Sequence, residues 1–168
     1  GEAPRPAQVL RNQSNYFNYQ ETRREYESFN TGIPKFDKNK KTILYLRSKG
    51  LRINGLGWQA HLRSDQPLAN DSSQLKFLGD LIDWAHKNDL DFHVTEMDYR
   101  IEDGNNSNEA LQRQAKAYAN ILGVLLSKKD QGVVTFNTWG MVDGKPGPHH
   151  NKHRFIFDSK LNPKPAYY

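Results

Sequence analysis

Two acidic side chains, Glu96 and Asp98, stand two positions apart at the end of the apolar segment 92–98. Because side chains of a β-strand alternate between its faces, both carboxylates are expected to point to the same side. Burying a carboxylate without partners is costly, so packing alone explains the pair poorly. The spacing therefore predicts catalytic chemistry at the carboxyl end of this strand.

Four short β-like runs recur at intervals of roughly 40 residues, the spacing of strand-plus-helix units. They cover residues 7–12, 53–61, 92–98 and 133–139. Three helical patterns lie between them, at about 37–50, after 71–73, and at about 107–127. This order predicts an α/β fold with a parallel sheet and right-handed crossovers.

The helical patterns also predict which side chains face the core. The first helix is expected to stop at Gly50 and the second to be capped by the Asp71-Ser72-Ser73 sequence. The expected inward-facing residues are Ile43, Leu44 and Leu46 in the first helix, Leu75, Leu78, Ile82 and Ala85 in the second, and Leu111, Ala115, Tyr118, Leu122 and Leu125 in the third.

Polar and aromatic residues gather where the predicted strands end. These residues are Gln59 and His61, Glu96 and Asp98, and Asn137 and Trp139. Functional groups at strand carboxyl ends are typical of a (β/α) barrel or an open doubly wound sheet. No glycine-rich phosphate-binding motif follows any of these strands, which counts against nucleotide binding.

Four segments, taken in order, resemble the family 10 glycoside hydrolases, retaining endo-β-1,4-xylanases built on a TIM barrel. Residues 54–62 (NGLGWQAHL) resemble the sixth-strand motif, and residues 94–98 (VTEMD) resemble the seventh-strand motif I-T-E-L-D. Residues 134–143 (VTFNTWGMVD) resemble the eighth-strand segment ending in W-G-x-x-D, and residues 162–167 (NPKPAY) resemble the usual family ending. The ordered combination is specific although each piece alone is weak.

The resemblance implies a role for each candidate residue. Glu96 would be the nucleophile, with His61 bonded to its carboxylate and Asp98 orienting the imidazole. Gln59 would reach sugar hydroxyls, and Trp139 would form an apolar platform under the ring at the cleaved bond. Further substrate contacts are expected from Asn12 and Asn15, which match part of the fifth-strand N-D-Y-N pattern, and from Asn137.

The matched segments correspond to strands five to eight of a barrel that needs eight strands and typically about 250 residues. Residues 1–168 are thus expected to form the C-terminal half of the catalytic barrel. The family's W-D-V-x-N-E motif, which carries the general acid/base, has no counterpart. No credible substitute exists among Glu21, Glu25, Glu27, Glu102 and Glu109. The loop from Gly144 to His149 also lacks the second cleft tryptophan that is usual in the family.

Composition excludes several other classes. With 24 Lys+Arg against 19 Asp+Glu the net charge is +5, and only the run 38–41 is distinctly basic, so no nucleic-acid partner is expected. The lack of cysteine excludes disulfides and thiol catalysis. No stretch approaches about 18 apolar residues, so no membrane partner is expected. The first six residues have no secretion-signal pattern, and the histidines His149, His150 and His153 lack a spaced carboxylate partner for a metal.

The resemblance implies retaining hydrolysis of internal xylan bonds without a metal or organic cofactor, outside the cytoplasm, either extracellularly or in the periplasm. Alternatives are a non-catalytic carbohydrate-binding half-barrel and an unrelated doubly wound binding domain. Because four strands cut from a barrel expose an inner face, an N-terminal half-barrel or a second copy of this chain is expected to cover it. The covered face is expected to be apolar and to include Val94, Glu96, Phe136 or Thr135, and Trp139.

Overall fold

The computed structural model describes residues 8–11, 35–64, 71–101, 106–144 and 153–168. In these ranges, parallel strands alternate with helices as predicted. The elements are β1 (Gln8–Arg11), α2 (Lys35–Ser48), β2 (Ile53–Trp58), β3 (His61–Arg63), α3 (Ser72–Lys87), β4 (Asp91–Arg100), α4 (Asn108–Lys128), β5 (Val134–Thr138) and the short 3-10 helix η2 (Pro165–Tyr167).

The long strand β4 organises the sheet. Its first part, residues 91–94, pairs with β2, and its last part, residues 98–100, pairs with β3. Residues 92–94 of β4 pair with β2 on one side and with β5 on the other. β5 therefore lies along the edge of β4 that faces away from β2. β1 pairs with β2, and all four pairings are parallel. The strands therefore lie in chain order, as consecutive strands of a barrel do. The run 53–61 is predicted as one strand, whereas the structure has two strands there, β2 and β3, that follow one another along β4.

Local sequence signals set the helix ends. The Asp71 carboxylate caps α3 by accepting hydrogen bonds from the backbone N–H groups of Ser73 and Gln74, at 2.8 and 3.4 Å. Gly50 follows α2 with a φ of 76°, the left-handed conformation that glycine adopts at low cost. Both predicted signals are confirmed.

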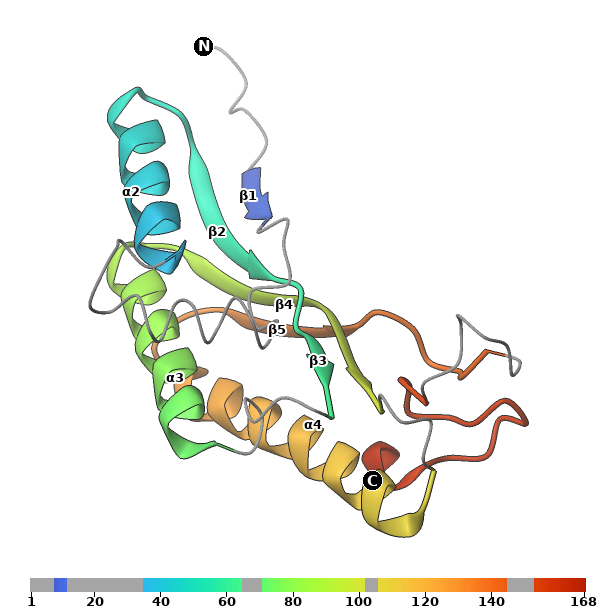
Figure 1. Ribbon diagram of the computed structural model, residues 1–168. Coiled ribbons are helices and arrows are strands. Elements are labelled where there is room, and N and C mark those ends of the chain that lie inside the picture. The colour runs from blue at the N-terminus through green and yellow to red at the C-terminus, as the bar shows by residue number, and fades with distance from the viewer. Residues whose placement is uncertain (1–7, 12–34, 65–70, 102–105, 145–152) are drawn as a thin grey trace.

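The hydrophobic core lies between the sheet and its helices, which cover one side of the sheet (Figure 1). Phe92 and Val94 of β4 are fully buried there, and Phe136 of β5 packs edge-on against Tyr118 of α4 with ring centroids 6.3 Å apart. Val94 and Phe136 therefore face the helices, so the expectation that Val94 lies on the face left for a partner is wrong. Of the alternatives Phe136 and Thr135, it is Thr135 that lies on that face.

Two helix faces also differ from expectation. Leu44 of α2 is 47% exposed, although Ile43 is fully buried. The buried face of α4 consists of Ala110, Gln114, Ala117, Tyr118, Ile121 and Leu125, whereas Leu122 is exposed. On this buried face the Gln114 amide donates to the carbonyls of Tyr99 and His153. An apolar periodicity cannot reveal a buried polar residue of this kind.

The opposite face of the sheet is polar rather than apolar. His93 of β4 contacts Thr135 of β5 there, with Nδ1 and Oγ1 2.9 Å apart. The His93 ring also lies against Gly55 of β2, where a Cβ atom would come within 2.8 Å of Nε2. Glycine at position 55 thus makes room for a large polar side chain on this face. Within the described ranges, no helix is both long and apolar enough to cross a membrane.

Candidate active site

A bulge in β4 positions the acidic residues. Between the pairs Trp58 to Val94 and His61 to Asp98, β4 advances by one residue more than the strands beside it. The register with β5 shifts over the same stretch, residues 94–97. The simple alternation expected from the sequence is therefore interrupted, and Met97 and Asp98 are both buried. Bulges of this type redirect side chains next to functional sites.

The two predicted carboxylates nevertheless meet at one imidazole. His61 Nε2 lies 3.3 Å from Glu96 Oε2, and His61 Nδ1 lies 3.2 Å from Asp98 Oδ2. The side chains of Glu96 and Asp98 are 13% and 3% exposed, so these contacts are poorly screened by water. The sequence prediction that His61 links the two acids is consistent with this geometry.

The environment raises the pKa of His61 above its ordinary value. The largest cause is the interaction of the His61 ring with the Asp98 side chain, which raises the pKa. Burial lowers the pKa in part, and the negative charges of Asp98 and Glu96 raise it further. A protonated imidazole has an N–H on each nitrogen, so it can face both carboxylates at once. The Glu96 carboxylate is thereby held in a fixed position beside the imidazole.

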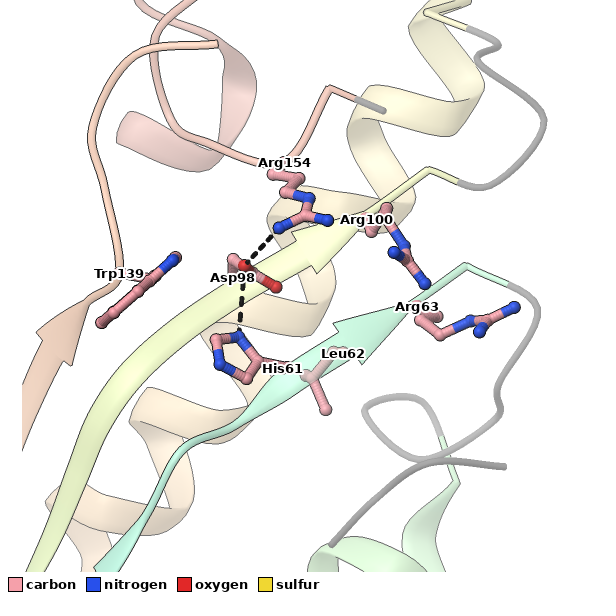
Figure 2. A pocket seen from close by; sticks show the side chains of 7 residues that line it. All are labelled: His61, Leu62, Arg63, Asp98, Arg100, Trp139 and Arg154. Atoms are coloured by element: carbon pink, nitrogen blue, oxygen red, sulfur yellow. Dashed lines mark ion pairs between the residues drawn. The ribbon is translucent and has the colours of Figure 1, made fainter. Parts of the chain in front are cut away.

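Trp139 stands beside this group, immediately after β5. Its ring meets the His61 ring edge-on with centroids 5.9 Å apart, and its backbone N–H donates to the Met97 carbonyl at 3.0 Å. The side chain is 57% exposed. A cavity of about 310 Å³ opens here, lined by His61, Leu62, Arg63, Asp98, Arg100, Trp139 and Arg154 (Figure 2). An exposed indole held at such a cavity can stack on a sugar ring.

The remaining predicted residues are less closely associated. Gln59 is half-buried in the break between β2 and β3, and Asn137 is exposed on β5. Neither lines the cavity. Asn12 and Asn15 lie outside the described residues, as do His149 and His150. Among the residues that the structure describes, no group of histidine and acidic side chains could hold a metal ion.

Sequence reasoning missed Arg154, whose Nη1 lies 3.6 Å from Asp98 Oδ2. No strand, helix or recognised motif marks its position. It also gave no role to Asp143 and Lys164, whose side chains form a buried ion pair at 3.0 Å. Here a signal was present, because the two opposite charges stand in the W-G-x-x-D and P-K-P-A-Y segments.

Comparisons with known proteins agree with the resemblance. The model of "Glycosyl hydrolase family 10" matches residues 18–168. An exoglucanase of Acetivibrio thermocellus is 31% identical over 144 residues, 86% of this chain and 12% of that protein. An endo-1,4-beta-xylanase of Geobacillus stearothermophilus is 28% identical over 153 residues, 85% of this chain and 46% of that protein.

The fold is also found among solved structures. That of xylanase 10B from Thermotoga petrophila in complex with xylobiose superposes with a TM-score of 0.64 and 25% identity, over 79% of this chain and 40% of that one. This chain thus spans less than half the length of these matched proteins. Its parallel strands, in chain order, correspond to part of a closed barrel. The chain belongs to glycosyl hydrolase family 10, and its sheet is part of that family's TIM barrel.

Proposed function

We propose that residues 1–168 form the C-terminal half of a retaining endo-β-1,4-xylanase barrel and supply its nucleophile. The observation that carries this proposal is the contact between Glu96 and His61, 3.3 Å apart at the carboxyl end of the parallel sheet. Active sites of TIM barrels lie at that end. Asp98 supports the imidazole from its other side, at 3.2 Å.

In this proposal the Glu96 carboxylate attacks the anomeric carbon and forms a covalent glycosyl-enzyme intermediate, which water then hydrolyses. His61 holds the Glu96 carboxylate in its orientation. Trp139 supports the sugar ring at the cleaved bond. Gln59, Asn137, Asn12 and Asn15 are proposed to contact sugar hydroxyls. The two-carboxylate mechanism requires neither a metal nor an organic cofactor.

The second carboxylate, the general acid/base, must come from outside this sequence. An N-terminal half-barrel is the proposed source, and it would cover the polar face that carries His93 and Thr135. A second copy of this chain could cover the face but would bring no acid/base motif. Because xylan is an extracellular polymer, we propose an extracellular or periplasmic location.

A non-catalytic carbohydrate-binding half-barrel is the second candidate function. The exposed Trp139 favours it, since stacking on a sugar needs no acid/base. The carboxylate of Glu96, 13% exposed and supported by His61 and Asp98, favours catalysis. A pure binding module gains nothing from a shielded nucleophile of this kind.

Covalent trapping tests the catalytic proposal. This chain would be combined with strands one to four of a family relative, and the assembly treated with a 2-fluoro-xylobioside that carries a good leaving group. We expect labelling of Glu96 in a peptide map, and loss of the label in Glu96→Gln. Glu109→Gln, at an exposed surface ion pair with Arg113, is the matched control and should be labelled normally. Labelling of another carboxylate would contradict the assignment.

A second probe of the same kind, a cellobioside, distinguishes specificity for xylan from specificity for glucan.

A further inference from the structure

The segment 153–157 crosses the carboxyl end of β4 and is held there by its backbone. The Arg154 carbonyl accepts hydrogen bonds from the Tyr99 N–H at 3.3 Å and from the Tyr118 hydroxyl at 3.4 Å. The His153 carbonyl accepts from the amide of Gln114 at 2.6 Å and from Lys164 Nζ at 3.0 Å. Burial, with the charges of Asp98 and Asp143, raises the pKa of Tyr118, which keeps its hydroxyl a neutral donor. The segment is thus fixed from β4, α4 and the chain end.

A buried ion pair anchors the same segment. Lys164 Nζ lies 3.0 Å from Asp143 Oδ2, and the two side chains are 6% and 2% exposed. The other oxygen of Asp143 accepts the backbone N–H of Phe155 at 2.8 Å. Burial lowers the pKa of Lys164, and the Asp143 carboxylate opposes this effect. The acid of the W-G-x-x-D segment and the lysine of the P-K-P-A-Y segment therefore act together on residues next to Arg154.

Arg154 projects from this anchored segment onto Asp98. Its Nη1 lies 3.6 Å from Asp98 Oδ2, the same oxygen that lies 3.2 Å from His61 Nδ1 (Figure 2). This oxygen is fully buried and makes no aligned hydrogen bond within the described part of the chain, and it lies within ion-pair distance of the Arg154 guanidinium and the His61 imidazole. Four side chains of alternating charge follow one another: Glu96, His61, Asp98 and Arg154.

We infer that Arg154 is a positioning residue for the nucleophile, acting through Asp98 and His61. A guanidinium stays charged at every working pH, so it balances Asp98 whether or not His61 is protonated. Asp98 is then held in place beside Nδ1, and the second nitrogen of His61 stays directed at Glu96. The catalytic meaning of this inference rests on the proposed function, whereas the electrostatic coupling of Arg154 to His61 does not.

The pKa of His61 in the 168-residue chain tests the coupling directly, through ¹⁵N chemical shifts of the imidazole followed against pH. The charged groups around His61 are Glu96 and Asp98 from β4, Arg154 from the anchored segment, and Arg63 and Arg100 along the cavity. Arg154→Gln removes one positive charge near the imidazolium, so the pKa of His61 should rise by about half a unit or more. Arg154→Lys keeps the charge and should stay near the wild-type value.

Arg113→Gln is the matched control, since it removes an arginine from the exposed face of α4. It should leave the His61 titration unchanged. An Arg154→Gln protein whose His61 titrates as in wild type would overturn the inference, even if that protein were less stable. An Arg154→Lys protein that shifts as far as Arg154→Gln would also overturn it.

Trapping of Glu96 separates this inference from the proposed function. In the assembled barrel, Arg154→Gln should slow labelling of Glu96 about tenfold, the usual scale for a supporting residue, while Arg113→Gln should not. Unchanged labelling of Glu96 in Arg154→Gln would refute the positioning role and leave the xylanase proposal intact. If neither the wild type nor any variant is labelled, but the pKa of His61 still shifts in Arg154→Gln, the xylanase proposal and the catalytic meaning of the inference are refuted. Only the electrostatic coupling of Arg154 to His61 then stands.

Discussion

The Ala60 carbonyl accepts the backbone N–H of Asp98 at 3.3 Å, and Ala60 itself has a φ of 59°. Residues other than glycine seldom adopt this left-handed conformation, and strain of order 1–3 kcal/mol persists only where the surroundings enforce it. The turn at Ala60 ends the pairing of β2 and starts that of β3 one residue later, at His61. The direction of the imidazole toward Glu96 and Asp98 therefore depends on this one backbone conformation.

Substitutions at Ala60 test the cost of its left-handed conformation. Ala60→Gly removes the left-handed penalty and adds chain entropy of about 0.5–1 kcal/mol to the unfolded state, so the free energy of unfolding should change little. Ala60→Val places a β-branched side chain in the same conformation at a site 1% exposed, and should destabilise the protein by about 2 kcal/mol or more. Urea unfolding measures both. Equal stability of the Val and Gly variants would refute the role of the φ angle.

Stability should depend on pH through His61. The folded state raises the pKa of this group above 6.5, so folding binds a proton more tightly there. The resulting stabilisation is fully present below pH 6.5 and is lost as the pH rises through the folded-state value. We expect the free energy of unfolding to fall over that interval in wild type, and to fall less in His61→Gln. Identical slopes in the two proteins, measured by urea unfolding at several pH values, would exclude this linkage.

The site was more predictable than the details of the fold. That Glu96, His61 and Asp98 lie close together could be predicted because strand carboxyl ends converge in a parallel sheet and their spacing matches a known motif. The break at Ala60 was hidden, since a left-handed alanine carries no glycine signal and the run 53–61 shows no turn residue at that point.

Other features depend on tertiary contacts that a linear pattern does not carry. The buried face of α4 includes Gln114 because two distant carbonyls accept its amide. Arg154 reaches Asp98 because backbone hydrogen bonds and the Asp143–Lys164 pair hold an irregular segment in place. Such segments have no periodicity from which their path could be predicted.

The predicted cap of α3 should contribute to stability by a known amount. Asp71→Ala removes the acceptor of the Ser73 and Gln74 N–H groups and should cost about 1 kcal/mol at neutral pH. Hydrogen bonding from Ser73 lowers the pKa of Asp71, so this difference should persist above pH 3.8 and shrink as the pH falls through the folded-state value. Asp80→Ala, which removes only an exposed pair with Lys76, should cost about 0.5 kcal/mol or less. Both variants can be measured by urea unfolding. Equal losses of stability in Asp71→Ala and Asp80→Ala would contradict the capping role.

Breaking the buried pair behind the site should be more damaging than removing both charges. Lys164→Met leaves the buried Asp143 carboxylate with only the His153 ring, 3.5 Å away, as a basic neighbour, and should cost about 3–5 kcal/mol. Adding Asp143→Asn removes the charge and keeps an acceptor for the Phe155 N–H, so the double variant should recover part of the loss. Guanidinium unfolding measures both proteins. A double variant less stable than Lys164→Met would show that the carboxylate has another essential partner.

Hydrolysis should require more than this chain. A general acid contributes about 10²–10⁴ to the rate of glycoside cleavage, and the 168-residue sequence has no counterpart of the family motif that carries it. We therefore expect the purified chain, verified by intact mass, to release almost no reducing sugar from xylan. Addition of a complementary half-barrel with strands one to four should restore hydrolysis, and Glu96→Ala should abolish that gain, while Glu109→Gln should not. Rapid hydrolysis by the chain alone would mean that one of its own carboxylates acts as the acid.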